Sequence, residues 1–239
     1  QPDAIVDAAP DVMVDAEVPV RCIEVPPGTD VVRADFTVPV TLAVVDVFFL
    51  IDATASMTDE IENVRRRLVD VVVPGVRAEI PDAAFGLSFL GEFPVEPYGP
   101  PRIKPYELRS TITTDIRQIA AQLEVIPTWG NNDDPEAQIE ALYQVATGAG
   151  LAPWIDPFLG CARGGCPRGG SGGACFRPDA MPVVVLITDA PMHNGPPGED
   201  PVDPYAFEGP HSYEEAIAAI RSAGIFVIGL GARGPRRPS

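Results

Sequence analysis

Long apolar runs alternate along the chain with segments whose apolar residues recur at helical spacing. The run VVDVFFLID at 44–52 is nearly continuous, and so is VVVLIT at 183–188. Continuous runs of this length are typical of parallel strands that are buried on both faces of a sheet. Further strands are predicted at 83–93, 106–114 and 225–230.

Between these runs, the apolar residues of each segment fall on a single helical face. The first such stripe covers residues 61–71, with Thr58 as the expected cap and Pro74-Gly75 as the expected end of the helix. Later helices are expected to begin at Thr114, at Asp134-Pro135-Glu136 and at the capping box Ser212–Glu215.

From Val44 onward, the predicted order of elements is β-α-β-β-α-α-β-α-β. Alternation of strands and helices along the chain produces a mostly parallel sheet whose crossover helices lie on its faces. We therefore expect an α/β fold over residues 44–231: a Rossmann-like, doubly wound, mostly parallel sheet with helices on both faces.

The segments that flank this predicted domain have a different composition. Residues 1–20 carry five acidic side chains, no basic one and no periodicity, which indicates a disordered acidic spacer. Such a spacer is either a tether to an envelope or membrane anchor or an inert leader. Residues 21–43 are interpreted as a lead-in segment and residues 232–239 as a basic tail.

Three of the four cysteines lie in a Gly-rich insertion predicted at 148–181. Cys161, Cys166 and Cys175 are separated by four and eight residues, and Cys22 is distant. These spacings match no common zinc pattern, so disulfides of an exported protein are favoured. Four cysteines allow three pairings; one arrangement links Cys22 to the insertion and leaves the other two cysteines paired locally.

The charge of the chain narrows its possible partners. The formal net charge is −17, and Lys104 is the only lysine. A chain of this charge is repelled by nucleic acid and by anionic membranes, so metal ions or cationic partners suit it better. No apolar run is long enough to span a bilayer. With the cysteines, this favours an extracellular, cell-surface or envelope location, with any signal peptide removed or absent from this chain.

Oxygen-bearing side chains follow two of the predicted strands and precede one helix. Asp52, Thr54 and Ser56 end or directly follow the run 44–52, Asp189 follows the run 183–188, and Asp133 lies just before a helix. Because the carboxyl ends of parallel strands meet at one edge of an open sheet, we expect these side chains to converge. Hydroxyls and carboxylates, without thiol or imidazole, suit a hard cation: Mg²⁺, or Mn²⁺ or Ca²⁺ in its place.

The same three stretches resemble motifs of the von Willebrand factor A domain, in its integrin-β-like and bacterial branch. The first motif of that family, D-x-S/T-x-S, reads DATAS at 52–56, and its T-D-A-P reads TDAP at 188–191. The Gly-rich G-D-x-P-E segment of the branch corresponds to NDDPE at 132–136, where Asp133 takes the place of a Thr that other branches supply.

This resemblance implies a metal-ion-dependent adhesion site with one divalent ion at the top of the sheet. An open position on the ion would take an acidic side chain of a partner protein, so the implied function is a binding or adhesion module rather than an enzyme. The family continues past its VIGLG strand with a further helix, strand and helix, whereas this chain continues with ARGPRRPS at 232–239. The domain is therefore expected to be truncated or to be completed by another element.

An enzyme is the alternative. A phosphatase of the haloacid dehalogenase type also places an Asp at the end of its first strand, as Asp52 is placed here. Such an enzyme needs a second Asp two residues later as a general acid, and Thr54 occupies that position. Lys104 is also poorly placed to hold a phosphate. His193, which follows the third motif, is expected to be exposed to solvent.

Overall fold

A computed structural model describes residues 44–158, 166–197 and 203–231, and every structural statement below concerns these residues. The predicted spacer at 1–20, the lead-in at 21–43 and the tail at 232–239 lie outside them, as do Cys22 and Cys161. The expected truncation concerns residues after Gly231, which the structure does not describe.

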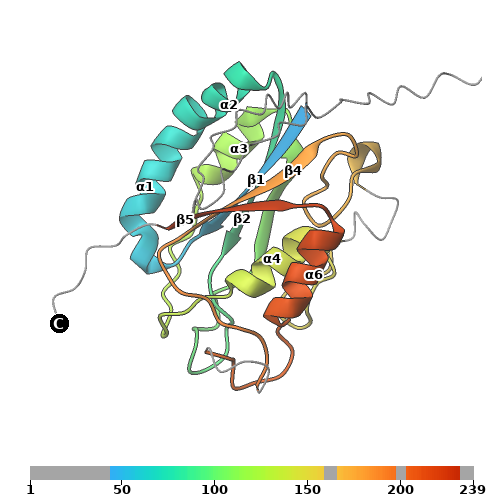
Figure 1. Cartoon of the computed structure of the whole chain (residues 1–239). Coiled ribbons are helices and arrows are strands. Elements are labelled where there is room, and N and C mark those ends of the chain that lie inside the picture. The colour runs from blue at the N-terminus through green and yellow to red at the C-terminus, as the bar shows by residue number, and fades with distance from the viewer. Residues whose placement is uncertain (1–43, 159–165, 198–202, 232–239) are drawn as a thin grey trace, which may run out of the picture. The chain divides into compact units, whose positions relative to one another are not determined.

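Five strands form one sheet in the order β3-β2-β1-β4-β5 (Figure 1). The central strand β1 (Val44–Asp52) pairs in parallel with β2 (Asp82–Leu90) and with β4 (Met181–Thr188). Strand β5 (Phe226–Gly231) adds to β4 in parallel, and β3 (Glu107–Thr113) adds to β2 in the antiparallel direction. The predicted mostly parallel α/β sheet is therefore confirmed, with one antiparallel edge strand.

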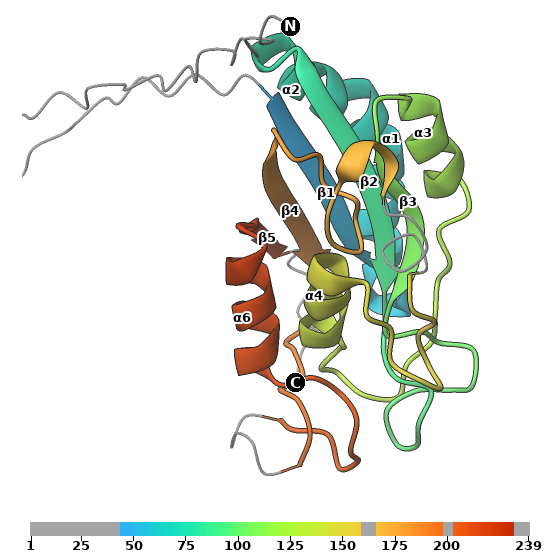
Figure 2. The same ribbon diagram turned by 90° about the vertical axis from the view of Figure 1, so that its right-hand side faces the viewer.

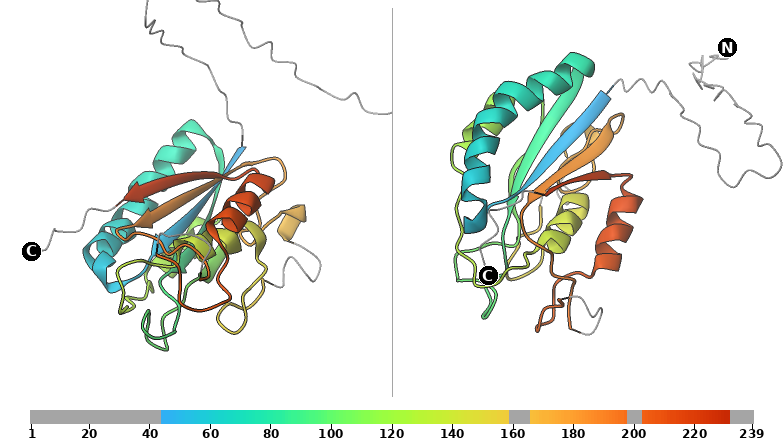
Figure 3. Two further views of the ribbon diagram at one scale, coloured as in Figure 1. Left: turned by 60° about the horizontal axis from the view of Figure 1, so that its bottom comes forward. Right: turned by 60° about the vertical axis from the view of Figure 1, so that its left-hand side comes forward.

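Helices cover both faces of the sheet, as Figures 2 and 3 show. On one face, α1 (Thr58–Arg67), α2 (Val73–Glu79) and α3 (Ile116–Leu123) pack over a core that includes Phe49, Phe85 and Phe89. On the other face, α4 (Gln138–Thr147) and α6 (Tyr213–Ser222) pack over a core that includes Phe48 and Leu186. The central strands are buried on both sides, which is why their sequences are apolar without alternation.

Several predicted helix boundaries are wrong, although the helices exist. Thr58 is the first residue of α1 rather than its cap, and its hydroxyl donates to the Ala55 carbonyl. Pro74 does not end the first helix: a π-helical turn at Leu68–Val72 leads into α2, where Pro74 lies in the first turn and needs no hydrogen-bond partner. The cap of α3 is Asp115, not Thr114.

The helix predicted to begin at Asp134-Pro135-Glu136 begins later, at Gln138, and no side chain caps it. Glu136 is fully buried instead of lying in an exposed first turn. The capping box of Ser212 and Glu215 at the start of α6 is confirmed. Gly148 ends α4 with φ of 64°, a left-handed conformation that favours glycine.

The described part of the insertion is held to the edge of the sheet. Cys166 and Cys175 form a disulfide, which confirms local pairing of two of the insertion cysteines. Next to it, the backbone N–H of Ile112 in β3 donates to the Ala174 carbonyl. The insertion therefore covers part of an otherwise open strand edge.

Arg177 joins the end of the insertion to the start of the two central strands. Its guanidinium donates to the Asp46 carboxylate at 2.7 Å, to the Asp82 carboxylate at 2.7 Å and to the Val45 carbonyl at 3.1 Å. Asp46 is completely buried, and burial raises its pKa while the contacts with Arg177 oppose that rise. The pair lies at the opposite end of β1 from Asp52.

The far edge of the sheet is open in the described part of the chain. Strand β5 pairs with β4 alone, and four of its apolar side chains are exposed: Phe226, Val227, Ile228 and Leu230. Among the described residues, no helix combines the length and the hydropathy that a bilayer crossing requires.

We predict that Arg177→Met destabilises the protein by about 3 kcal/mol, because it leaves the Asp46 carboxylate buried without a cation. Urea unfolding at pH 7 measures the change. The double variant Arg177→Met with Asp46→Asn should recover part of the loss, whereas Arg117→Met, at an exposed ion pair, should leave stability almost unchanged. Equal effects of the two single Arg variants would contradict this account.

Candidate metal centre

Two parallel strands that pair side by side bring the first and third motifs together. Ile51 of β1 is in register with Ile187 of β4, so the residues that follow, Asp52 and Asp189, emerge from neighbouring strands at the same edge of the sheet. Residues 137 positions apart along the chain thereby share one site. The convergence predicted for these motifs follows from the parallel register.

Four of the five predicted ligand residues form a continuous chain of oxygen atoms. The Thr54 hydroxyl donates to Oδ1 of Asp52 at 2.7 Å and lies 3.1 Å from the Ser56 hydroxyl. The Ser56 hydroxyl in turn donates to Oδ1 of Asp189 at 3.0 Å. Two carboxylates are thus bridged by two hydroxyl groups.

The Asp52 carboxylate is the most constrained member of this group. It is completely buried and accepts hydrogen bonds from the backbone N–H and hydroxyl of Thr54, and from the Thr188 hydroxyl at 2.7 Å. Burial raises the pKa of Asp52, the nearby Asp189 adds to the rise, and the hydrogen bonds oppose it. Thr188 was not among the predicted site residues, although it belongs to the TDAP motif.

Main-chain pairing fixes the loop that carries Thr54 and Ser56. The N–H of Ala55 donates to the Trp129 carbonyl, and the N–H of Trp129 donates to the Ala53 carbonyl, both at 2.8 Å. This short parallel bridge lies just before the second motif, so it holds the first and second motifs against each other. Ser56 in this loop is exposed to solvent, so the chain of oxygen atoms reaches the protein surface.

Glu136 is a member of the site that the sequence analysis missed. Its carboxyl group is fully buried; Oε1 accepts from the Asn131 amide at 2.6 Å, and Oε2 has no hydrogen-bond partner among the described residues. Burial, together with the charges of Asp52, Glu92 and Asp189, raises the pKa of Glu136 to about 10, and the Thr54 hydroxyl opposes the rise. Its place after Pro135 suggested a helix start, which concealed this role.

Asp133 does not join the chain of oxygen atoms in this structure. Its Oδ1 accepts from the backbone N–H of Asp134, and its Oδ2 lies 3.3 Å from Nε2 of His193. His193 is buried rather than exposed, which corrects the expectation for this residue. Its Nε2 also lies 3.6 Å from Oε2 of Glu92, and its Nδ1 lies 2.8 Å from the Asp203 carbonyl.

Glu92 is a further buried carboxyl group at this edge of the sheet. It follows β2, the neighbour of β1, so the rule that identified Asp52 and Asp189 could also have identified it. Its Oε1 accepts from the Tyr205 hydroxyl at 2.7 Å. Burial raises the pKa of Glu92 to about 8, and the charges of Asp133 and Asp52 contribute.

A cluster of aromatic rings packs beside Glu92. Phe93 contacts Trp154, Tyr205 and Phe207 edge-on, with ring centroids 5.0–5.4 Å apart. Tyr98 packs against His193 and Tyr205 in the same cluster. These contacts exclude water from the Glu92 carboxyl, which explains why burial dominates its pKa.

In the described part of the chain, no three side chains of His, Cys, Asp or Glu are grouped so that they alone could hold a metal ion. A cation at this edge would therefore depend on the Thr54 and Ser56 hydroxyls together with the carboxylates. Neighbouring ligands of an octahedral Mg²⁺ lie about 3 Å apart, and the oxygen pairs of the Asp52–Asp189 chain are 2.7–3.1 Å apart. The residues present fit a hard cation in both chemistry and spacing.

We predict that the metal-free protein loses stability as pH rises. Glu92 and Glu136 have pKa values of about 8 and about 10 in the folded protein, against an ordinary value near 4.3 when unfolded. A carboxyl group whose pKa is raised in the folded protein contributes its full stabilisation below its unfolded pKa. That contribution is lost as pH rises through its folded pKa. In EDTA, each of these two carboxyl groups should lower the free energy of unfolding by about 1.4 kcal/mol per pH unit between pH 5 and its own folded pKa, so the loss between pH 5 and pH 8 should reach several kcal/mol.

Glu92→Gln should remove much of this pH dependence, because the amide cannot ionise. The matched control is Glu124→Gln, an exposed residue at the end of α3, which should leave the profile unchanged. Denaturant unfolding at half-unit pH steps measures both, and a wild-type profile that rises between pH 5 and pH 8 would contradict the predicted burial of protonated carboxyls.

Comparisons with known proteins identify no family for this chain. No family model matches it, and no curated protein matches it. Among solved structures, it is similar to proximal thread matrix protein 1 from the mussel byssus, with 13% identity and a TM-score of 0.42 over 80% of this chain. It is also similar to the pilus adhesin SpaC from Lactobacillus rhamnosus GG, with 12% identity and a TM-score of 0.46 over 80% of this chain. The chain spans 38% and 24% of the lengths of these two proteins.

Proposed function

We propose that this chain is a von Willebrand factor A-like module that binds a partner protein through a divalent metal ion. The observation that supports this proposal is the chain of oxygen atoms from Asp52 through Thr54 and Ser56 to Asp189 at the carboxyl edge of the sheet. Three motifs in order along the sequence meet around that edge. Each lies at the end of a strand or just before a helix, as the resemblance requires.

The residues at this edge divide into direct candidates and supporting charges. Thr54, Ser56, Asp52 and Asp189 would hold the ion, and Mg²⁺ is the cation whose preference for oxygen and for octahedral spacing they match best. Asp133 is 32% exposed and would join through water or by a shift of its loop. Glu136, whose free oxygen is buried, would supply negative charge once a cation favours its ionised form.

A bound divalent ion would change what this edge can attract. Without it, the half-buried carboxyl groups of Asp133 and Asp189 and the net charge of −17 repel acidic groups. Because Ser56 is exposed and Asp189 is half-buried, an ion between them would be reachable from solvent. It would then accept a carboxylate of a partner protein as a further ligand.

An exported or surface-tethered location suits this function. The disulfide between Cys166 and Cys175 is of a kind that persists in oxidising compartments outside the cytosol. The ligand of an adhesion module is also met outside the cell.

The phosphatase alternative fits the structure less well. The second position of its motif is occupied by Thr54, whose hydroxyl donates to Asp52 and cannot serve as a carboxylic general acid. Lys104, the only lysine, is paired with Glu107 at 2.6 Å and lines a hollow to which none of the candidate metal ligands contributes. Neither group needed for phosphoryl transfer is therefore at the Asp52 site.

We predict that Mg²⁺ stabilises the protein after treatment with EDTA. At 100 times its dissociation constant, an ion that binds only the folded state adds about 2.7 kcal/mol. Thermal unfolding against Mg²⁺ and Mn²⁺ concentration should therefore show a saturable rise in Tm of several degrees.

Ser56→Ala and Asp52→Asn should reduce or abolish this rise, since each removes a direct ligand. Ser222→Ala and Asp70→Asn change exposed residues of the same types away from the site and should leave the response intact. A response that survives in Ser56→Ala and in Asp52→Asn would place the ion elsewhere. Absence of any response in the wild-type protein would remove the metal from the proposal.

The binding module and the alternative phosphatase differ in whether they hydrolyse a phosphate ester. Incubation with p-nitrophenyl phosphate and Mg²⁺ should release no more phenolate from the wild-type protein than from Asp52→Asn. Turnover that depends on Asp52 would favour the phosphatase over the binding module.

A further inference from the structure

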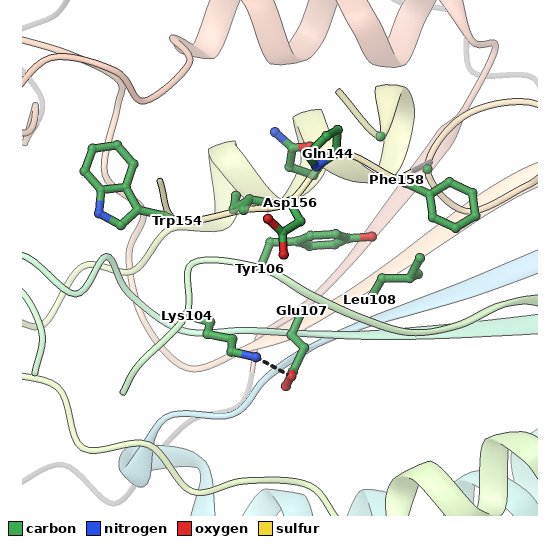
Figure 4. Close-up of a pocket in the computed structure, with 12 residues that line it drawn as sticks. Lys104, Tyr106, Glu107, Leu108, Gln144, Trp154, Asp156 and Phe158 are labelled. Carbon is green, nitrogen blue, oxygen red and sulfur yellow. Dashed lines mark hydrogen bonds and ion pairs between the residues drawn. The ribbon is translucent and has the colours of Figure 1, made fainter. Parts of the chain in front are cut away.

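The hollow that Lys104 lines opens between β3, the end of α4 and the first part of the insertion (Figure 4). Its volume is about 530 Å³, which lies in the range of pockets that take small organic ligands. The side chains that line it include none of the candidate metal ligands, so it is a separate site.

Three aromatic side chains, Tyr106, Trp154 and Phe158, contribute to its walls. Tyr106 is buried at the base, and its hydroxyl has no hydrogen-bond partner among the described residues. Trp154 is held from behind, because its ring packs against Phe93 and Phe207 with centroids 5.2 Å and 5.4 Å away. The Trp154 ring is therefore fixed before any ligand arrives.

The charged groups at the hollow are unequally neutralised. Lys104 and Glu107 point toward each other and are paired at 2.6 Å, and Arg109 lies 3.4 Å from the same Glu107 oxygen (Figure 4). Asp156 is exposed and has no cationic partner among the described residues. Among the described charged groups at this hollow, Asp156 is thus the one without an ion-pair partner.

The Gln144 side-chain amide, which also lines this hollow, already has hydrogen-bond partners within the protein. The Gln144 amide donates to Glu140 at 2.7 Å, and its carbonyl accepts from the backbone N–H of Gly150 at 2.8 Å. A ligand therefore meets aromatic faces, the buried Tyr106 hydroxyl and the Asp156 carboxyl group. Aromatic faces and a carboxylate together attract cations and repel anions.

We propose that this hollow binds an organic cation with an apolar arm, such as an alkylammonium group. The arm lies against Tyr106, Trp154 and Phe158, and the ammonium group pairs with Asp156. The net charge of −17 adds a long-range attraction for such a ligand. The same chemistry is supplied by a free amine or by a lysine side chain of a partner protein. The site does not depend on the proposed metal ion.

The test uses the two tryptophans as reporters. The chain contains only Trp129 and Trp154, so protein labelled with 5-fluorotryptophan gives two ¹⁹F signals, assigned with Trp129→Phe. Titration with n-pentylammonium in EDTA should move the Trp154 signal saturably and leave the Trp129 signal in place. The neutral 1-pentanol should bind more weakly, and the anionic pentanoate should not shift the Trp154 signal.

Variants at the charged groups give opposite signs. Asp156→Asn should weaken n-pentylammonium binding about five-fold, the effect of one solvent-exposed ion pair. Lys104→Met should strengthen it about two-fold, because it removes a competing cation from Glu107. Asp179→Asn, an exposed acidic residue that does not line the hollow, should change neither value.

N-acetyl-lysine amide distinguishes the two sources of the cation. Saturable binding of both it and n-pentylammonium supports a site open to a partner's lysine, and binding of n-pentylammonium alone supports a site for a free amine. The proposal is overturned if pentanoate moves the Trp154 signal as strongly as n-pentylammonium, if Asp156→Asn leaves the affinity unchanged, or if no ligand moves that signal at millimolar concentration.

Discussion

The burial of the Asp52 carboxylate at the end of the central strand is the constraint on which the rest of the site depends. A carboxylate without exposure is costly unless it is neutralised by a proton, a cation or several hydrogen bonds. Here Thr54 and Thr188 supply those bonds from two different motifs. The need to satisfy one buried carboxylate therefore ties the two loops together.

The acidic groups around Asp52 are buried close to one another, and their ionisation destabilises the folded protein. Glu92 and Glu136 are buried with raised pKa values, and each has a carboxyl oxygen without a hydrogen-bond partner in the described part of the chain. Such an arrangement is unfavourable for folding at neutral pH and favourable for a cation, because an ion would compensate several charges at once. The same residues that weaken the metal-free fold would favour a divalent ion at the proposed site.

The insertion after α4 connects regions that the core fold would leave apart. Its disulfide and its hydrogen bond to β3 protect one edge of the sheet, while Arg177 fixes its end beside the buried Asp46. At its beginning, Trp154 forms a wall of the hollow that Lys104 lines, and it packs against Phe93, the residue after Glu92. A long loop that is anchored at several points can build a binding surface without losing its shape.

The strand pattern and the three motifs could be predicted from the sequence because both follow from local chemistry. Apolar runs without alternation are typical of strands in the middle of a parallel sheet, and parallel strands bring Asp52 and Asp189 to one edge. Helix boundaries near Pro74 and Pro135 were predicted less well, since the local preference for a cap or a stop was outweighed by packing. The place of Glu92 at this edge could have been predicted from the strand that it follows, but the burial of Glu92, Glu136 and His193 depends on which loops fold over them. Contacts between residues far apart in the chain also determine whether Asp133 faces the Asp52 carboxyl group or His193, because its loop is held by Asn131 and by residues that follow β4.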